Sequence, residues 1–422
     1  MAVEKTYLPR AIEGVLDRWM TGAAAVALDG VKGVGKTETA LRRATHTWFL
    51  DDPQDRSLAK ADQDFALVPD GTLLIDEWQN MPVVWDQVRR AVDRGATPGR
   101  FLLTGSATPP RDADAHSGAG RILSLRMRPM ALFERGHVEP TVSLEALCDG
   151  GGAAEISGRT TWTVADYVTA ICESGFPGIL RVPDEEIREE FLRSYIYRVI
   201  DRDLPHNGYR ARHPEVLRRW LAAYAAASSL TTSYSRILDA TTGGDGEQPS
   251  KQTTQVYREH LTALWLLDPV PGFVARSHEF GRLTVAPKHQ LADPALAAIL
   301  LDKNAATLAQ AKNAGLLGQL FESLTTLSVR VAADAIRART SHLRESKGAH
   351  EIDLIVEDRR GRVVAIEVKL ASYVEDKDVR HLLWLKSIMG EELADMVVVT
   401  TGQVAYRRPD GVAVVPLALL GV

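Results

Sequence analysis

One eight-residue stretch near the N-terminus constrains this chain more than any other feature. Residues 30–37 read GVKGVGKT, which fits the pattern GxxxxGK[ST], and an apolar run that ends at Asp29 precedes them. Glycine at three of these positions lets backbone N–H groups curl around phosphate oxygens, where a side chain would clash. A strand before the loop and helix formers after it are the context in which this motif binds nucleotides. The sequence therefore predicts an ATP-binding phosphate loop.

The residues of this loop have separate predicted roles. Lys36 would place a positive charge on the β- and γ-phosphates, and the Thr37 hydroxyl would hold Mg²⁺. The predicted nucleotide contacts within the loop are Gly30, Val31, Lys32, Gly33, Val34, Gly35, Lys36 and Thr37. ATP and Mg²⁺ are thus the predicted cofactors.

A second motif lies 40 residues after Lys36, where a buried-strand pattern ends in Asp76 and Glu77. We expect Asp76 to orient Mg²⁺ through its water shell and Glu77 to act as the catalytic residue that polarises the attacking water. An ordinary strand followed by an acidic helix cap would look the same. The pairing of the two motifs favours the catalytic interpretation.

A third strand pattern, residues 101–106, ends in polar side chains. Thr104 or Ser106 is expected to touch the γ-phosphate or the attacking water, although a turn with a helix cap fits equally well. Arg121 is the candidate catalytic arginine finger, acting in cis or on the nucleotide of a neighbouring copy. A surface arginine is the alternative.

Several further motifs follow in order. They are IDEWQ, FLLTGSA, SGAGRI, LRMRPMALFE, GFP at 175–177, YIYRVIDRDL at 195–204 and DPAL at 293–296. In this order after the phosphate loop, they resemble the bacterial and archaeal AAA-like ATPases that carry a C-terminal DUF4143 region. The resemblance covers nearly the whole chain and implies a winged-helix-like module in the middle.

The middle of the chain is predicted to be helical. Residues 234–240 and 251–265 fit the second and third helices of a winged helix-turn-helix. Such a module would either contact DNA or pack against the ATPase. The candidate DNA contacts are Lys251, Gln252, Thr254 and Arg258.

The last third holds the second chemical signal. Asp353 lies on one predicted strand, and Glu367 and Lys369 share one face of the next, which gives D-x13-E-x-K. This is the pattern of the restriction-endonuclease-like PD-(D/E)xK fold, and Glu322 on the preceding helix would be its first acid. Glu322, Asp353 and Glu367 would then bind a divalent metal, with Asp353, Glu367 and Lys369 acting in catalysis. The alternative is a solvated hairpin with alternating charges.

Composition limits the partners. Lys plus Arg total 50 against 55 Asp plus Glu, so no global basic field attracts nucleic acid. Two cysteines cannot form a disulfide framework, and no apolar run approaches the length of a membrane span. We expect a soluble, cytoplasmic protein with no membrane contact.

Together these features predict an α/β protein of three parts. We expect an AAA-like P-loop domain with a parallel sheet (1–140), a linker (141–163), a helical, winged-helix-like region (164–310) and a PD-(D/E)xK-like α/β domain (311–422). The first hypothesis is a Mg²⁺-dependent ATPase coupled to a DNA-directed nuclease-like domain. The second is an ATP-switched regulatory or protein-interaction module with an inactive nuclease-like domain. The partners would be DNA, a protein or a second copy of the chain.

Overall fold

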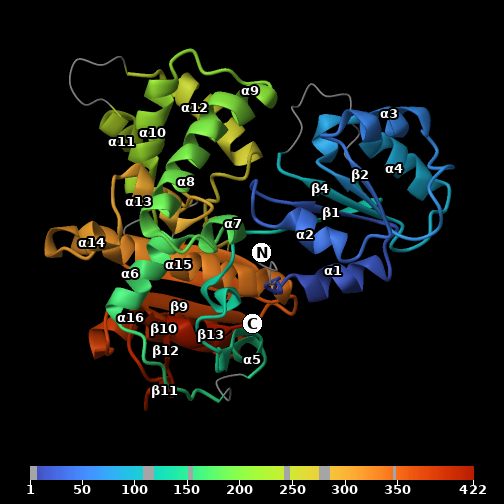
Figure 1. Ribbon diagram of the computed structural model, residues 1–422. Coiled ribbons are helices and arrows are strands. Elements are labelled where there is room, and N and C mark those ends of the chain that lie inside the picture. Colours follow the sequence, from blue (N-terminus) through green and yellow to red (C-terminus); the bar gives the residue numbers. More distant parts are fainter. Residues whose placement is uncertain (1–6, 108–117, 151–154, 242–247, 275–285, 346–347) are drawn as a thin grey trace.

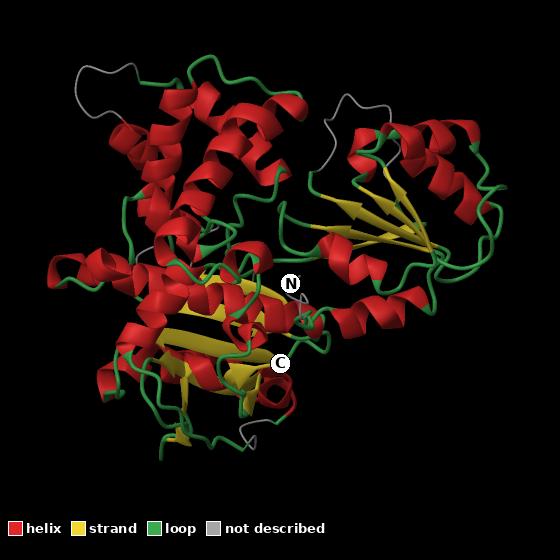
Figure 2. Cartoon of the chain, viewed as in Figure 1, coloured by secondary structure: helices red, strands yellow, loops and turns green. Residues whose placement is uncertain are grey.

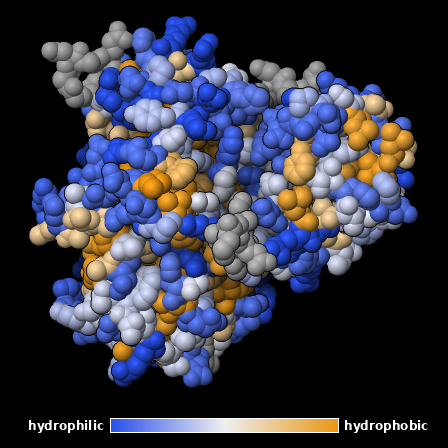
Figure 3. Space-filling model, viewed as in Figure 1, coloured by the Kyte–Doolittle hydropathy of each residue, from blue (hydrophilic) through white to orange (hydrophobic). Residues whose placement is uncertain are grey.

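The computed structural model describes residues 7–107, 118–150, 155–241, 248–274, 286–345 and 348–422. It has three parts: an N-terminal α/β domain, a helical region, and a C-terminal α/β domain (Figure 1). The long helix α15 lies between the helical region and the C-terminal sheet (Figures 1 and 2). The face in Figure 3 is largely hydrophilic, and its hydrophobic residues gather in separate patches. No helix among the described residues has the length and apolar character needed to cross a bilayer.

The N-terminal domain is built on a five-stranded parallel sheet with the order β2-β3-β4-β1-β5. Its strands are β1 (Ala25–Asp29), β2 (His46–Phe49), β3 (Leu73–Asp76), β4 (Phe101–Gly105) and β5 (Ile122–Arg126). Its helices are α1 (Glu13–Met20), α2 (Lys36–Leu41), α3 (Pro53–Ala61) and α4 (Val83–Asp93). Strands β1, β3 and β4 are almost wholly buried, because helices cover both faces of the sheet. The carboxyl ends of β1 and β3 therefore deliver the phosphate loop and the Asp76-Glu77 pair to one edge.

Glycine is required at two points of the phosphate loop. A Cβ on Gly30 would lie 2.1 Å from the carbonyl oxygen of Met127 in the segment after β5, so the two backbones approach too closely for any side chain. Gly35 begins α2 with φ +99°, a left-handed conformation that glycine adopts without strain.

Part of the segment predicted as a linker forms secondary structure that packs against the C-terminal domain. Strand β6 (Val142–Ser143) pairs with β13 (Leu420–Gly421), and α5 (Leu144–Asp149) follows β6 directly. Arg362 and Arg360 both form ion pairs with Asp149 at the end of α5. Residues 151–154 of the predicted linker lie outside the described residues.

The helical region runs from α6 to α14. Its helices are α6 (Val164–Glu173), α7 (Pro177–Leu180), α8 (Glu185–Arg198), α9 (Leu204–His206), α10 (Pro214–Ala226), α11 (Tyr234–Thr241), α12 (Lys251–Ala263), α13 (Pro294–Leu300) and α14 (Ala305–Leu308). One π-helical segment, Val199–Asp203, joins α8 to α9. Helices α11 and α12 occupy the positions predicted for a helix-turn-helix. Between α12 and α13 the described residues form no extended strand. Isolated bridges there pair Leu267 with Leu291 and Val270 with Lys288.

The C-terminal domain has a six-stranded mixed sheet with the order β11-β12-β10-β9-β8-β7. Its elements are α15 (Ala314–Ala335), β7 (Arg339–Arg344), β8 (Glu351–Glu357), β9 (Val363–Lys369), α16 (Asp376–Met389), β10 (Leu393–Thr400), β11 (Tyr406–Arg407) and β12 (Ala413–Pro416). Strands β7, β8 and β9 are antiparallel neighbours, whereas β9, β10 and β12 run parallel. One apolar core joins α15, the helical region and the inner faces of both sheets.

Candidate functional site

The phosphate loop folds around the side chain of Lys36. That side chain is 4% exposed, and its Nζ donates hydrogen bonds to the carbonyl oxygens of Gly30 (2.7 Å) and Val31 (3.1 Å). Burial lowers the pKa of Lys36 to about 8, and the nearby Glu77 opposes this shift. The ammonium is therefore held inside the loop, where bound phosphate oxygens would take the place of the two carbonyls.

Asp76 and Thr37 meet next to the loop, as the metal hypothesis requires. Thr37 Oγ1 donates to Asp76 Oδ1 (2.8 Å), and Thr104 Oγ1 donates to the same oxygen (2.5 Å). Burial raises the pKa of Asp76, which the two hydroxyl donors counteract. One hydroxyl and one carboxylate fit Mg²⁺, because this ion usually keeps several waters and takes few protein ligands.

Glu77 is fixed by two side chains from neighbouring segments. Ser106 Oγ donates to Glu77 Oε2 (2.7 Å), and Gln79 Nε2 also donates to that oxygen. The backbone of Glu77 is left-handed, with φ +52°, a sparsely populated conformation that often marks a functional position. Thr104 thus contacts Asp76, and Ser106 contacts Glu77. Gln79 was not predicted, although it lies only two residues beyond Glu77.

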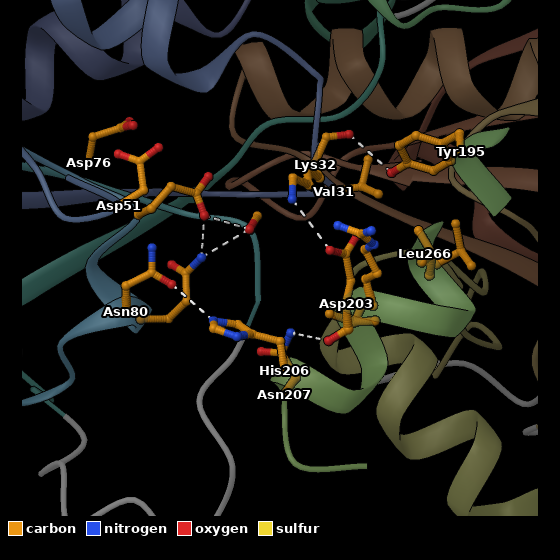
Figure 4. A pocket seen from close by; sticks show the side chains of 16 residues that line it. Val31, Lys32, Asp51, Asp76, Asn80, Tyr195, Asp203, His206, Asn207 and Leu266 are labelled. Atoms are coloured by element: carbon orange, nitrogen blue, oxygen red, sulfur yellow. Dashed lines mark hydrogen bonds and ion pairs between the residues drawn. The ribbon is translucent and has the colours of Figure 1, made fainter. Parts of the chain in front are cut away.

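A cavity of about 470 Å³ opens beside these residues. Val31 and Lys32 line it from the N-terminal domain, and Tyr195 lines it from the helical region (Figure 4). Glu77 and Arg202 are also among its lining residues. Its position makes the cavity a site shared by two parts of the chain.

Three contacts of the helical region reach the loop domain across this cavity (Figure 4). Tyr195 Oη donates to the carbonyl oxygen of Lys32 (3.0 Å), and Lys32 Nζ forms an ion pair with Asp203 Oδ1 (3.4 Å). His206 Nε2 lies 3.1 Å from Asn80 Oδ1. Tyr195 and Asp203 belong to the YIYRVIDRDL motif, which is one of the motifs that carry the family resemblance. The sequence analysis predicts no role for this motif.

A second, mostly apolar slot lies against Val34 and Gly35 of the phosphate loop. Its walls include Leu8 from the N-terminal segment, Met127 and Met130 after β5, and Pro177 at the start of α7. Pro177 also abuts the loop, since its Cγ would lie 3.7 Å from a Cβ at Gly35. The GFP motif thus places part of the helical region against the loop.

Arg121 lies far from this site within one chain. It precedes β5, whose first residue pairs with Ala25 at the start of β1, whereas the phosphate loop follows the end of β1. Its guanidinium forms an ion pair with Asp93 Oδ1 (2.9 Å) at the end of α4. Arg121 is therefore at the opposite edge of the sheet, which argues against a finger acting in cis. A role on a neighbouring copy's nucleotide stays a prediction.

The LRMRPMALFE motif forms a buried ion cluster that joins all three parts. Asp268 of the helical region contacts Arg126 Nη1 (2.8 Å) at the end of β5, Arg128 Nε (2.7 Å) just after it, and Arg330 Nη1 (2.9 Å) of α15. Burial alone would raise the pKa of Asp268. The charges of the arginines, above all that of Arg128, instead hold the pKa of Asp268 well below its usual range. These ion pairs connect the end of β5, which lies next to the phosphate loop, to the helical region and to α15.

The predicted acids of the C-terminal domain do converge, but a lysine stands between two of them. Lys288 Nζ forms ion pairs with Glu322 Oε1 (2.7 Å) and Asp353 Oδ1 (2.8 Å), and Lys369 Nζ pairs with Glu367 Oε1 (2.8 Å). Nowhere in the described ranges do three His, Cys, Asp or Glu residues form a group that could hold a metal ion. The predicted metal triad of Glu322, Asp353 and Glu367 is thus replaced by ion pairs. Sequence reasoning did not single out Lys288.

The candidate DNA contacts on α12 are only partly available. Lys251 and Gln252 are exposed, but Thr254 is buried. The guanidinium of Arg258 stacks 3.7 Å from the ring centre of Tyr234 on α11. These contacts join α12 to α11, so this face has a packing role whether or not it also meets DNA.

Comparison with known proteins supports the predicted AAA domain and the predicted DUF4143 region. Residues 23–135 match an AAA domain, residues 164–307 match a domain of unknown function (DUF8612), and residues 317–420 match another (DUF4143). The chain therefore carries an AAA domain and a DUF4143 region, and the AAA domain supports ATP binding. No curated protein matches the chain.

Two solved structures are distantly similar. A Walker-type ATPase of Pyrococcus abyssi is 14% identical over 70% of this chain and 97% of its own, with a TM-score of 0.43. A structure of Drosophila ORC bound to DNA is 14% identical over 61% of this chain and 86% of its own, with a TM-score of 0.20. Both scores are too low to assign a function.

Proposed function

We propose that this chain is a Mg²⁺-dependent ATPase that works as a nucleotide switch. In this proposal the helical region responds to the nucleotide that is bound at the phosphate loop. The observation that carries the proposal is the arrangement around Glu77. Thr37 Oγ1 donates to Asp76, Glu77 is oriented by Ser106, and the helical region lines one side of the cavity beside them. A cleft that holds phosphate, metal and an oriented carboxylate suits in-line attack of water on a γ-phosphate.

Each residue would act through its own atoms. Lys36 Nζ would leave the carbonyls of Gly30 and Val31 and bind phosphate oxygens. Thr37 Oγ1 and Asp76 would hold Mg²⁺, which would supply charge neutralisation on the phosphates when bound. Glu77 would accept a hydrogen bond from the attacking water. Arg202, which lines the cavity from the helical region, is a better candidate than Arg121 for a cationic group near the γ-phosphate in cis.

The apolar slot would take the base. It is flanked by Leu8, Met130 and Pro177, and its floor is the loop itself at Gly35. A flat aromatic base buries its faces well between apolar side chains. In this arrangement the helical region would contact both ends of the nucleotide, through Pro177 at the base and Tyr195 near the phosphates.

The test is ATP binding and hydrolysis by purified full-length variants. Lys36→Ala should weaken binding of a fluorescent ATP analogue at least tenfold, because it removes the charge on the phosphates. Glu77→Gln should keep that binding and lose most turnover, because the amide cannot accept a proton from water. Wild-type turnover in Glu77→Gln would show that Glu77 does not have this role. Glu145→Gln, an exposed position on α5, is the matched control for the second variant.

A DNA-directed nuclease-like role is the second candidate function. Supporting observations are the element order α15-β7-β8-β9-α16-β10 and the side-by-side placement of Asp353 and Glu367 on β8 and β9. The ion pairs of Lys288 weigh against activity in the present arrangement. Incubation with Mg²⁺ or Mn²⁺ and single- or double-stranded DNA and RNA tests this role. Cleavage that vanishes in Asp353→Asn would support it, and no cleavage in any condition would favour the purely regulatory switch.

A further inference from the structure

A further cavity lies in the helical region, between the connection from α9 to α10 and the first turns of α12 (Figure 1). Its volume is about 500 Å³, a size that holds small molecules. Arg210 and Arg212 line it from the connection, Val216 from α10, and Thr253 and Val256 from α12. In Figure 3 this end of the helical region is predominantly hydrophilic.

The positive charge at this cavity has no acidic partner among the described residues. Arg210 and Arg212 are exposed and form no ion pair with any described residue, and the described residues that line the cavity include no Asp or Glu. Glu215, the acid closest to them in the sequence, pairs instead with Arg218, which also pairs with Asp201 (2.6 Å). Two guanidinium groups at one cavity, with no carboxylate between them, are suited to bind an anion.

Part of the cavity wall is apolar. Val216 on α10 and Val256 on α12 are half-buried there, and the buried side chain of Tyr257 also lines the cavity. The ring of Tyr257 is held by an edge-on contact with Trp220 of α10, with ring centroids 5.8 Å apart. Rigid apolar side chains beside two cations suit a ligand that has an apolar or aromatic body and an anionic group.

The number of charges favours a phosphate monoester over other anions. Such a group carries a charge of about −1.5 to −2 at neutral pH and has three acceptor oxygens, which match two guanidinium groups. A carboxylate, or a phosphodiester within a nucleic-acid strand, carries one charge and would leave one guanidinium without a charge partner. We propose that this cavity binds a small organic phosphate monoester. Its phosphate contacts Arg210 and Arg212, and its body packs against Val216, Val256 and Tyr257.

The proposed site follows the nucleotide cavity directly in the chain. Asn207 lines the nucleotide cavity, and Tyr209, two residues later, lines this one. The ring of Tyr209 stacks on His260 of α12, with ring centroids 4.6 Å apart. Gln252 is the single candidate DNA contact that lines this cavity. The two cavities thus share one segment of chain, but the proposal concerns binding alone and does not depend on ATP turnover.

Calorimetric titration with phenyl phosphate tests the proposal, because this probe carries an aromatic body and a phosphate monoester but no nucleoside. All proteins are full-length and carry Lys36→Ala, which removes the ammonium of the phosphate loop. This parent should bind phenyl phosphate at one site per chain. Arg210→Gln combined with Arg212→Gln should weaken the binding by about tenfold or more, since hydrogen bonds to a charged group are lost.

The matched control is Arg219→Gln combined with Arg236→Gln. It removes the same number of charges from exposed arginines that do not line the cavity. Salt screens such distant charges, so the control should bind phenyl phosphate with nearly the affinity of the parent. Because all four arginines are exposed, both double variants should fold. Equal affinities of the two double variants, or no binding of phenyl phosphate by the parent, would overturn the proposal.

Three further probes test which part of the ligand is recognised. Phenyl sulfate has nearly the same shape but a single charge, so it should bind more weakly than phenyl phosphate. Inorganic phosphate lacks the apolar body and should also bind more weakly. Equal affinity for either probe would contradict the corresponding part of the proposal. A single-stranded oligonucleotide without a terminal phosphate should not displace phenyl phosphate, and displacement would make the cavity a nucleic-acid site instead.

Discussion

Replacing Asp268 by Asn should strongly destabilise the protein, because the buried carboxylate of Asp268 contacts three arginines, of which Arg128 is buried and Arg126 and Arg330 are partly buried. Its carboxylate lies 2.7 to 2.9 Å from Arg128, Arg126 and Arg330. The amide has nearly the same volume, so the substitution removes the charge and leaves the packing almost unchanged. Arg128 keeps Asp334 as a second partner, but Arg126 and Arg330 lose their charge partner in this cluster.

The magnitude follows from burial. The side chain of Asp268 is 6% exposed, and those of Arg126 and Arg330, which lose this partner, are 25% and 11% exposed, so water can replace only part of the lost charge. Removing one partner of a buried ion pair costs about 3–5 kcal/mol, since the remaining charge is left uncompensated. Against a total stability of about 5–15 kcal/mol, this is a large fraction.

Urea unfolding followed by tryptophan fluorescence at neutral pH measures this effect. The matched control is Asp64→Asn, because Asp64 pairs with Arg94 at 2.9 Å but both side chains are more than half exposed. Exposed pairs contribute little, so this control should unfold near the wild-type midpoint. Equal urea midpoints for Asp268→Asn and Asp64→Asn would refute the view that the buried cluster fastens the three parts together.

Three further outcomes are expected. Since burial raises the pKa of Glu367 to about 8, its protonated form stabilises the fold at low pH, and this contribution is lost as the pH rises through about 8. The unfolding free energy of Glu367→Gln relative to wild type should therefore increase between about pH 5 and about pH 9, and a flat difference would contradict the assignment. Arg202→Ala should lower ATP turnover at saturating ATP with little change in ATP affinity, and unchanged turnover would remove it from the site. Arg121→Ala should lower turnover only if copies assemble, so equal turnover across protein concentrations would make Arg121 a surface residue that pairs with Asp93.

Local motifs allowed much of the nucleotide site to be predicted from the sequence. The spacing of GVKGVGKT fixes its own backbone, and the parallel strands that carry Asp76 and Thr104 end at the same edge of the sheet. The prediction that Thr37 and Asp76 share one Mg²⁺ therefore needed no long-range information, whereas the contacts of Thr104 with Asp76 and of Ser106 with Glu77 were not predicted.

Other features depended on contacts that no local pattern records. Tyr195 reaches Lys32 from 163 positions away, and Lys288 meets Asp353 from 65 positions away. A lone lysine in an otherwise unremarkable stretch gives no signal that it will neutralise two acids. Arg121 is predicted as a finger that acts in cis or on the nucleotide of a neighbouring copy, with a surface arginine as the alternative. Arg121 directly precedes β5 and so lies at the edge of the sheet away from the phosphate loop. The SGAGRI motif alone does not reveal at which edge of the sheet its arginine lies.

In the proposed switch, the helical region responds to nucleotide bound at the phosphate loop. Hydrogen–deuterium exchange of Glu77→Gln with ATP and Mg²⁺, compared with the nucleotide-free protein, tests it most directly. The account predicts slower amide exchange both in residues 30–41 and in residues 195–207, where Tyr195, Arg202 and His206 line the cavity. Protection of residues 30–41 alone, with unchanged exchange in residues 195–207, would contradict it.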